Sequence, residues 1–421
     1  MTSAFHYQGG VLCAENVPLD AIAKEVGTPC YIYSTKQLQK NYEDFKSAFK
    51  GMDITIYYAN KASPNQAVTR TLIECGAGVD ITSVGELERA LAAGAKPHKI
   101  IYSGVGKKRE EIMAALLAGV HQLNVESIPE LKQISAVAVE LQKTASIALR
   151  VNPDVGARTY KKTSTAETGV KFGIDHAQID EALKLATRLP GLAFKGFTIH
   201  LGSHVHDYEP YRAAYTKVVE LVRATRAQGI EVSRLDLGGG VTIPYDGQTV
   251  APFSEYAAIV MECIKDLKCE ISFEPGRRLV GDAGVLLSRV TYDKQGVSKR
   301  FLILDAGMND LIRPAMYEAR HSIIPLRESK VAPKIADVVG PVCETSDLFG
   351  MDYSLPGIEQ GDLVAILQAG AYSAAMASTY NGRPLIPEVL VSESQFSVVR
   401  RRIPVVEQIG WEALPPWMAS A

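Results

Sequence analysis

Short apolar runs and longer amphipathic stretches alternate through the middle of this sequence, and the alternation is its strongest constraint on the fold. The apolar runs are rich in Val, Ile and aromatic residues, as strands are, whereas the stretches between them space apolar residues three and four apart, as helices do. The expected strands are Ile54–Ala59, Gly78–Thr82, Lys99–Ser103, Gln122–Glu126, Ser146–Val151, Ala193–His200, Arg234–Leu237 and Glu270–Glu274. The expected helices are Pro64–Cys75, Val84–Ala93, Arg109–Leu117, Ile128–Leu141, His176–Leu189, Glu209–Gln228 and Pro252–Leu267. About eight such units over roughly 220 residues predict an α/β fold, a parallel (β/α)8 barrel of the TIM type instead of an open sheet.

A second, mainly β domain is expected after Arg278, where the long helical patterns end. The strands expected there are Leu286–Tyr292, Arg300–Leu304, Ala336–Val339, Asp362–Leu367, Pro387–Val391 and Phe396–Arg400. At the other end of the chain, Phe5–Cys13 has a strand pattern and can join this domain, while a helix at Thr35–Phe49 can complete the outer ring at the seam of the barrel. We therefore expect an N-terminal segment at 1–30, a barrel at 31–278 and a sandwich-like or barrel-like β domain at 279–421.

Charge and composition exclude several kinds of partner. The sequence contains 45 Lys and Arg residues and 47 Asp and Glu residues, so there is no basic excess to neutralise nucleic-acid phosphates. No apolar run approaches the roughly 18 residues that span a bilayer, and the N-terminus lacks the regions of an export signal. The six cysteines are scattered without a C-x-x-C pair, which favours reduced thiols in a cytoplasm over disulfides or a zinc site. We expect a cytoplasmic globular protein without nucleic-acid or membrane partners.

Reactive residue types gather at the carboxyl ends of the expected strands. Lys61 follows the first strand, Asp80 lies near the end of the second, His200 ends the sixth, Gly238–Gly240 follow the seventh and Glu274 ends the eighth. In barrel enzymes this rim carries the active site. Structural residues would be distributed over both rims, so the clustering predicts an active site here.

Each of these residues also has a plain structural interpretation. Lys61 alone could be a surface lysine, although a desolvated lysine at a barrel mouth is what Schiff-base chemistry uses. The three glycines could turn the chain or let backbone N–H groups approach a phosphate. His204 and His206 have the spacing of metal ligands, but the further ligands that a metal needs are not evident in the sequence. The Ser103–Lys108 segment lacks the spacing of a nucleotide-binding loop, so a barrel-end turn is expected.

Taken together, the motifs resemble the fold-type III pyridoxal-phosphate-dependent decarboxylases, most closely the branch that acts on diaminopimelate, over nearly the whole chain. The segments that carry the resemblance are Tyr58–Ala62, Val79–Leu87, Ser103–Lys107, Val151–Asp154, Lys171–Ile174, His200–Ser203, Leu235–Gly240, Glu274–Arg277, Arg313–Tyr317, Gly340–Glu344 and Gly370–Tyr372. It implies the (β/α)8 barrel with a β domain, pyridoxal 5'-phosphate as cofactor, and a homodimer that shares its active sites across the interface.

The resemblance also implies a role for each residue. Lys61 would hold the cofactor as an imine near Asp80, His200 would stack on its ring, and Glu274 would pair with the ring nitrogen. The residues expected around the cofactor's phosphate are Ser203, Gly239, Gly240, Gly276 and Tyr372. Cys343 from the partner subunit would donate a proton. The residues expected to bind the substrate are Arg277, Arg313, Tyr317, Glu344 and Tyr372, with Arg277 also near the cofactor.

The chemistry of these roles favours loss of carbon dioxide. Decarboxylation leaves an electron pair that a protonated pyridine ring absorbs, and the carboxylate of Glu274 keeps that ring protonated. The related alanine racemases have an arginine there. Arg277 and Arg313 can bind a distal carboxylate bidentately, and Glu344 a distal ammonium. A substrate with both groups at its far end is meso-2,6-diaminopimelate, and its product is L-lysine, the last step of lysine biosynthesis.

Three alternatives remain open from the sequence. The chain could decarboxylate another basic amino acid (ornithine, lysine or arginine), bind pyridoxal phosphate without catalysis, or be a metal-dependent hydrolase that uses His204 and His206. The chain also departs from the family pattern at several positions. These positions are Asn60, Ser63, Ala166, Ser346 and Arg278. They bear on substrate specificity and loop geometry more than on the cofactor chemistry.

Overall fold

The computed structural model describes residues 2, 4–155 and 169–418, and these residues form two compact units. One unit is Leu38–Gly281, and the other combines Met1–Gln37 with Asp282–Ala421. The expected first boundary at residue 30 therefore lies too early. The reason is β4 (Cys30–Ser34), which pairs with two strands of the second unit, β13 (Gly284–Gln295) and β19 (Glu388–Ser392).

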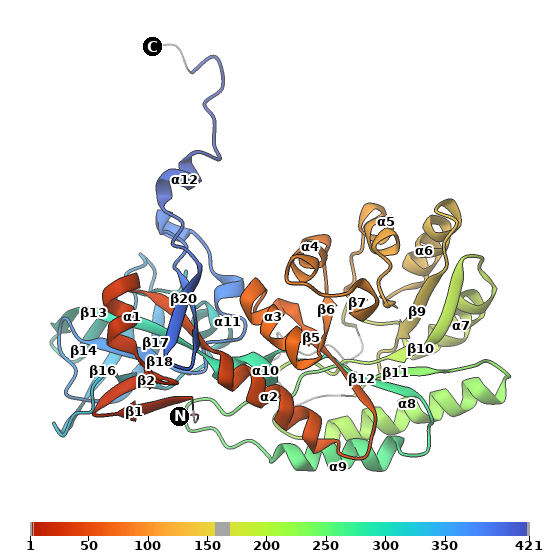
Figure 1. Ribbon diagram of the computed structural model, residues 1–421, viewed down its shortest axis with the longest axis horizontal. Helices are drawn as coiled ribbons and strands as arrows, with labels where there is room; N and C mark the ends of the chain where they lie inside the picture. The colour runs from red at the N-terminus through yellow and green to blue at the C-terminus, as the bar shows by residue number, and fades with distance from the viewer. Residues whose placement is uncertain (1, 3, 156–168, 419–421) are drawn as a thin grey trace. The chain divides into compact units, whose positions relative to one another are not determined.

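The first unit is a closed barrel of parallel strands in the order β10-β11-β12-β5-β6-β7-β8-β9 (Figure 1). The strands are β5 (Ile54–Ala59), β6 (Gly78–Ile81), β7 (Ile100–Tyr102), β8 (Gln122–Val125), β9 (Ala145–Arg150), β10 (Leu192–Thr198), β11 (Arg234–Asp236) and β12 (Glu270–Phe273). The helices are α2 (Thr35–Ala48, shared with the other unit), α3 (Gln66–Cys75), α4 (Val84–Ala92), α5 (Arg109–Ala118), α6 (Ile128–Glu140), α7 (Ile179–Arg188), α8 (Glu209–Ala227), α9 (Phe253–Ile264) and α10 (Arg277–Val280). The predicted parallel barrel is confirmed, and each expected strand and helix lies within a few residues of its place.

Local sequence signals explain where these helices begin. Ser83 and Ser127 each precede a helix, and each hydroxyl accepts a hydrogen bond from the backbone N–H three residues on, at Glu86 and Glu130. Such a cap satisfies an N–H group that has no partner within the helix. Because helical segments return the chain between successive strands, every strand enters the barrel in the same direction, and its carboxyl end arrives at one rim.

The expected helix before the first strand closes the barrel's outer ring. Phe45 of α2 and Phe49 just after it pack against Phe253 of α9 and Phe273 of β12, with ring centroids 4.7–6.1 Å apart. Aromatic contacts of this kind bury large apolar surfaces. They hold α2 against the last strand of the barrel, at the seam where the sequence pattern predicts it.

The second unit is mainly β, as expected. Its larger sheet has the strand order β17-β16-β14-β13-β4-β19-β20, and β18 pairs with both β13 and β15. The strands not yet bounded are β14 (Arg300–Leu304), β15 (Ile323–Pro325), β16 (Pro333–Val339), β17 (Leu348–Pro356), β18 (Leu363–Ile366) and β20 (Gln395–Arg400), and the short helices are α1 (Leu19–Val26), α11 (Arg313–Tyr317) and α12 (Val405–Ile409). The 12-residue strand β13 pairs along its length with β4, β18 and β14 in turn.

The expected N-terminal strand is wrong in one respect. Phe5–Cys13 is not one strand of the larger sheet but a hairpin, in which β1 (Phe5–Gln8) and β2 (Val11–Ala14) pair antiparallel and form a separate three-stranded sheet with β3 (Val17–Pro18). Gly9 and Gly10 have φ values of +58° and +79°. Two residues with positive φ form the tight turn that joins hairpin strands, so the two glycines end one strand and start another.

Among the described residues, no helix is both long enough and apolar enough to cross a bilayer.

Candidate active site at the mouth of the barrel

An ion pair between Lys61 and Asp80 links two neighbouring strand ends at the barrel mouth. Lys61 lies in a single 3₁₀ turn after β5, and its Nζ is 2.9 Å from Oδ2 of Asp80, near the end of β6. The Asp80 side chain is fully buried and that of Lys61 is 35% exposed, so the amine is the accessible partner. The second oxygen of Asp80, Oδ1, is buried without a hydrogen-bond partner. The pair presents a reachable amine with a proton acceptor beside it.

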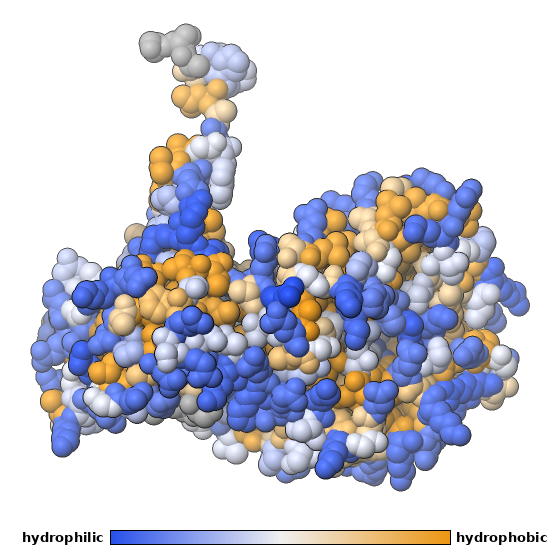
Figure 2. All heavy atoms as spheres, viewed as in Figure 1, coloured by the Kyte–Doolittle hydropathy of each residue, from blue (hydrophilic) through white to orange (hydrophobic). Residues whose placement is uncertain are grey.

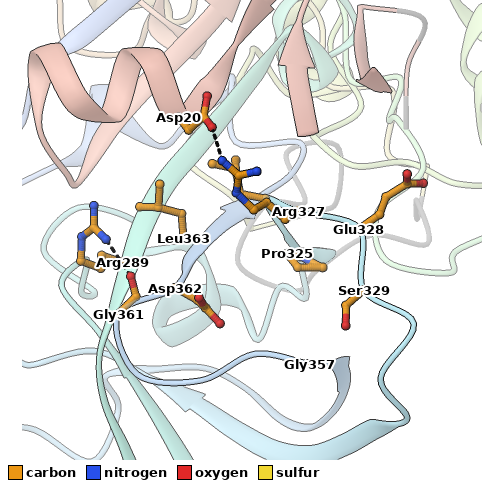
Figure 3. A pocket seen from close by; sticks show the side chains of 11 residues that line it. Asp20, Arg289, Pro325, Arg327, Glu328, Ser329, Gly357, Gly361, Asp362 and Leu363 are labelled. Atoms are coloured by element: carbon orange, nitrogen blue, oxygen red, sulfur yellow. Dashed lines mark hydrogen bonds and ion pairs between the residues drawn. The ribbon is translucent and has the colours of Figure 1, made fainter. Parts of the chain in front are cut away.

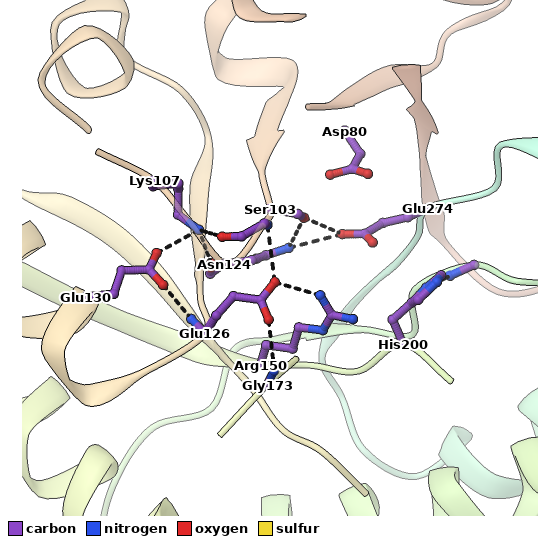
Figure 4. Close-up of polar contacts among 12 residues, drawn as sticks. Asp80, Ser103, Lys107, Asn124, Glu126, Glu130, Arg150, Gly173, His200 and Glu274 are labelled. Carbon is purple, nitrogen blue, oxygen red and sulfur yellow. Dashed lines mark hydrogen bonds and ion pairs between the residues drawn. The ribbon is translucent and has the colours of Figure 1, made fainter. Parts of the chain in front are cut away.

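Glu274 is a buried carboxyl group at the end of β12. Its Oε1 accepts hydrogen bonds from Ser103 Oγ at 3.2 Å and from Asn124 Nδ2 at 3.0 Å (Figure 4). Burial and the nearby carboxylates of Asp236 and Asp80 raise the pKa of Glu274 well above its ordinary value, against the charges of Lys61 and Arg150. This carboxyl group therefore becomes a carboxylate readily only when another positive charge lies against it.

Asp236, which the sequence did not single out, belongs to the same acidic cluster. Its Oδ1 accepts the Gly238 N–H at 2.8 Å, and its Oδ2 is buried without a hydrogen-bond partner. Burial raises the pKa of Asp236 to about 6, and the charge of Asp80 adds to the effect. The only sequence signal for it is an acidic residue in a short predicted strand, shortly before three glycines.

His200 is held as a neutral imidazole at the same rim. Its Nδ1 accepts a hydrogen bond from the Gly239 N–H at 3.1 Å, which leaves the proton of the neutral ring on Nε2. Burial, followed by the charges of Arg150 and Lys61, lowers the pKa of His200 well below its ordinary value. A neutral flat ring fixed at one nitrogen suits the predicted stacking better than proton transfer.

The glycines after β11 are required by close backbone packing. A Cβ atom on Gly239 would lie 2.2 Å from the carbonyl oxygen of Glu274, and one on Gly240 would lie 2.2 Å from that of Gly202. Gly240 also has a φ of +102°. Only glycine fits at such contacts. Their packing role is thus established by the geometry, and their phosphate-binding role stays a prediction.

Arg277, Ser203 and Tyr245 form a second polar group in the barrel unit. The buried Arg277 side chain donates to the Tyr245 hydroxyl at 2.7 Å and to Ser203 Oγ at 3.1 Å. Gly276 immediately precedes the short helix α10, which begins at Arg277. The structure therefore brings together Arg277 and Ser203, which sequence reasoning assigned to substrate and cofactor respectively. Tyr245 was missed, because a tyrosine in a loop carries no distinctive signal.

Buried ion pairs brace the rim around these groups (Figure 4). Lys107 Nζ lies 2.7 Å from Glu130 and donates to two backbone carbonyl groups, so its charge is used within the protein. Arg150 lies 2.6 Å from Glu126, whose other oxygen accepts the Gly173 N–H. The Ser103–Lys108 segment is the barrel-end turn expected from the sequence, between β7 and α5.

The two histidines considered as metal ligands pack against each other. His204 is buried, its Nδ1 lies 2.5 Å from Thr242 Oγ1, and its ring meets His206 edge-on with centroids 4.2 Å apart. Within residues 4–155 and 169–418, no three His, Cys, Asp or Glu side chains are grouped as metal ligands would be. Ala166, one of the departures from the family pattern, lies outside the described residues.

The remaining predicted residues belong to the β unit. Arg313 is buried in α11 and lies 2.6 Å from His321 Nε2, and Tyr317 ends the same helix. Cys343 and Glu344 are exposed on a turn, where the Cys343 N–H donates to Asn381. Tyr372 has a φ of +54°, a conformation that a tyrosine adopts only where its surroundings require it. The roles of these residues stay predictions.

Two hollows elsewhere lack the chemistry of the barrel mouth. A cavity of about 320 Å³ in the β unit has several charged residues in its lining, among which Arg327 pairs with Asp20 at 2.8 Å and Arg289 donates to the Gly361 carbonyl at 2.7 Å (Figure 3). Another, of about 440 Å³, lies at the amino ends of the barrel strands, the rim that stabilises barrels. The cluster at the carboxyl ends is therefore the candidate active site.

Comparison with known proteins agrees with this geometry. Residues 35–281 match the family of the pyridoxal binding domain of pyridoxal-dependent decarboxylases. The chain is similar to the diaminopimelate decarboxylase of Neisseria meningitidis serogroup A, with 44% identity over 95% of this chain and 98% of that one. It is 40% identical to the enzyme of that name from Zymomonas mobilis, over 98% and 99%. The crystal structure of diaminopimelate decarboxylase from M. jannaschii with L-lysine superposes with a TM-score of 0.94, 34% identity and 99% coverage of both chains.

Proposed function

The chain belongs to the pyridoxal-dependent decarboxylases, in the diaminopimelate decarboxylase group, and from this premise we propose that it converts meso-2,6-diaminopimelate to L-lysine and carbon dioxide at its barrel mouth. The observation that carries the proposal is the cluster of Lys61, Asp80 and Glu274: one accessible amine beside buried acids. This reaction is the last step of lysine biosynthesis, and the enzyme is a carboxy-lyase.

The residues of the barrel mouth fit pyridoxal 5'-phosphate. The cluster of Asp80, Asp236 and Glu274 contains more buried acid than the neighbouring cations compensate, since the pKa values of Asp236 and Glu274 are both raised. A protonated pyridine ring supplies the missing positive charge next to Glu274. The neutral imidazole of His200 offers a flat face to such a ring, and the Lys61 amine can take its aldehyde. The cofactor supplies the electron sink that accepts the pair left when the carboxylate departs.

Three side chains prepare the cofactor site. Ser103 and Asn124 donate to Glu274 Oε1 and fix the direction of its carboxyl group, so that the ring nitrogen meets an oriented acceptor. Asp80 Oδ2 can accept a proton from Lys61 Nζ, which frees the amine's electron pair for attachment to the cofactor. Ser203, Gly239, Gly240, Gly276 and Tyr372 are proposed to surround the phosphate.

Substrate binding and protonation are proposed for five further residues and for Tyr372. Arg277 and Arg313 would bind the distal carboxylate, Glu344 would bind the distal ammonium, and Tyr317 and Tyr372 would line the substrate. When carbon dioxide departs, a proton from Cys343 Sγ would take its place on the carbon. The thiolate then regains a proton from water, so the balance closes without another reactant.

We further propose a homodimer in which Cys343 reaches the active site of the partner subunit. The exposure of Cys343 and Glu344 supports this, because two chemically specialised residues on an exposed turn need another surface to act on. The cytoplasm is the proposed compartment, consistent with six cysteines that are all free.

A substrate panel tests the proposal. The purified protein, loaded with pyridoxal phosphate, is incubated separately with meso-diaminopimelate, lysine, ornithine and arginine, and carbon dioxide is measured. We expect preferential release from meso-diaminopimelate. Preferential turnover of one of the other three would overturn the substrate, and no release from any would leave a binding protein. Activity that chelators abolish, without a visible cofactor band, would instead indicate a metal-dependent hydrolase.

A further inference from the structure

Both tryptophans of the chain lie exposed near its C-terminus. Trp411 is 71% exposed and Trp417 is 79% exposed, and the sequence contains no other tryptophan. Around them, exposed apolar side chains follow one another; these are Val406 at 71%, Ile409 at 62%, Leu414 at 72% and Met418 at 62%. Figure 2 shows the apolar spheres along this segment. We call residues 404–418 the C-terminal arm. Isolated apolar residues are ordinary on a surface, but a continuous series of them marks a contact site.

The arm is fixed at its base and ordered within itself. At the base, Ile403 bridges to Leu385, and Arg402 donates to the carbonyl groups of Thr28 and Pro29. Beyond that point, Arg401 binds Glu407 with two nitrogens, and α12 and the turns after it make backbone hydrogen bonds. Among the described residues, every hydrogen bond and ion pair of residues 405–418 stays within 401–418. The arm extends from the unit that carries it (Figure 1), and its large apolar side chains are exposed.

We infer that the C-terminal arm docks on a second copy of this chain, each copy covering the arm of the other. A symmetric dimer forms two such contacts from one surface. Two buried tryptophans contribute roughly 300–500 Å² per arm, a large share of the roughly 800 Å² per partner in a stable interface. The inference rests on the proposed dimer but not on its chemistry.

The composition of the arm argues against a membrane as the occupant. Residues 404–418 contain Glu407 and Glu412 but no lysine or arginine, whereas anionic lipid surfaces select basic segments. Pro415 and Pro416 also prevent one continuous amphipathic helix. A folded protein surface with pockets for aromatic side chains is the better match.

Photocrosslinking distinguishes a second copy from the arm's own chain. Leu414 is replaced by p-benzoylphenylalanine in the full-length, cofactor-loaded protein, and the matched control carries the same residue at Val297, which is also exposed but lies in another loop. Irradiation is expected to give a covalent dimer from position 414 and none from position 297. Crosslinks only within one chain would overturn the inference, and so would crosslinks formed equally from both positions.

Intrinsic fluorescence reports the same event, because the arm holds the only tryptophans. For the full-length protein we expect a tryptophan emission that is blue-shifted from that of free tryptophan, and acrylamide quenching that is several-fold weaker. Dilution should reverse both changes over the concentration range in which light scattering shows the mass falling to that of the monomer. The variants Trp411→Phe and Trp417→Phe assign the change to each ring. Emission of fully hydrated tryptophan from a dimeric protein would contradict docking of the arm but would not contradict the dimer. Burial in a monomer, or only after phosphatidylcholine vesicles are added, would also overturn it.

Removal of the arm measures its contribution. A chain that ends at Ile403 is expected to bind cofactor normally, because the barrel residues are untouched, but to dissociate into monomers at roughly tenfold higher concentration or more. The double variant Trp411→Ser/Trp417→Ser keeps the backbone and is expected to act in the same direction. An unchanged dissociation constant in both would overturn the inference, whatever their decarboxylase activity.

Discussion

The barrel and the β unit carry the predicted reactive residues in opposite states. In the barrel, Lys61 and Asp80 are joined at 2.9 Å, and Glu274 is buried among hydrogen-bond donors. In the β unit, Cys343 and Glu344 lie exposed on a turn. The difference teaches that the barrel brings its own reactive side chains into contact with one another, whereas Cys343 and Glu344 are proposed to act on another surface. Substitutions in the two regions should therefore fail in different ways.

The largest effect is expected at Lys61. Lys61→Ala removes the amine that attaches the cofactor, so activity should fall by roughly 10³-fold or more. The visible absorption band of lysine-bound cofactor should disappear, as measured after dialysis. The matched control is Lys99→Ala, on the opposite rim of the barrel. Lys107→Ala would not serve, because Lys107 is buried in an ion pair. A cofactor band that survives dialysis in Lys61→Ala would mean that another lysine holds the cofactor.

Glu274 should show the opposition between catalysis and stability inside the barrel. In Glu274→Gln a neutral amide replaces the acid that pairs with the ring nitrogen, and turnover should fall by roughly 10²–10³-fold. The same change removes an acid whose charged form is disfavoured by burial and then by its acidic neighbours, so the cofactor-free protein should resist urea better.

A matched control comes from another buried acid of the barrel. Glu130→Gln leaves the Lys107 ammonium buried without its carboxylate partner, and should reduce the free energy of unfolding by about 3–5 kcal/mol. Urea unfolding midpoints of the two variants are then expected to move in opposite directions from that of the unmodified protein. Movement in the same direction would contradict the acidic-cluster description of Glu274.

Cys343 tests the other half of the comparison. Cys343→Ala should leave cofactor absorbance unchanged and slow turnover by roughly 10²-fold, because a proton donor is lost without any change at the barrel mouth. Single-turnover release of carbon dioxide and its steady-state rate are compared in the two proteins. The control is Cys75→Ala, which replaces a cysteine of the barrel helix α3. Full steady-state activity of Cys343→Ala would remove its role as proton donor.

The two regions also differ in how far the sequence predicted them. Helix–strand alternation and N-caps such as Ser83 and Ser127 are local signals, so the barrel's elements and its reactive rim could be placed residue by residue. The β unit depends on pairing between distant segments. β4 joins β13 across about 250 residues, and β17, with its Gly and Asp, has no clear alternation. Its roles therefore came from resemblance, and the structure does not test them.

Within the barrel, the residues that were missed are those whose importance is purely spatial. Asn124 lies in β8 and meets Glu274 only because the sheet closes, whereas Asp236 lies in β11, the strand that pairs with β12. A polar residue in a predicted strand is by itself an ambiguous signal, since it can face solvent or the interior. The useful rule is that a polar residue on a strand of a closed parallel barrel, where both faces are covered, needs a partner from another strand.

The smallest effect is expected at Asp236, and it depends on pH. Its pKa is raised from an ordinary 3.8 to about 6, so the folded protein binds this proton more tightly than the unfolded chain does. The contribution of this group to the free energy of unfolding is therefore fully present below about pH 4, and it is lost as the pH rises from about 4 through about 6. The loss is at most of the order of 3 kcal/mol. Asp236→Asn keeps the oxygen that accepts the Gly238 N–H and removes the titration, so it should be more stable than the unmodified protein above pH 6.

Urea unfolding of the cofactor-free protein at pH 5 and pH 8 measures this difference. The gain in the Asp236→Asn variant should be larger at pH 8 than at pH 5, because only at the higher pH does the unmodified protein carry the buried carboxylate. Asp53→Asn, at the opposite end of the barrel, provides a control that should show no such dependence. An equal gain at both values would mean that Asp236 does not titrate in this range. The surplus of buried acid that a cationic ring is proposed to balance would then rest on Glu274 and Asp80 alone.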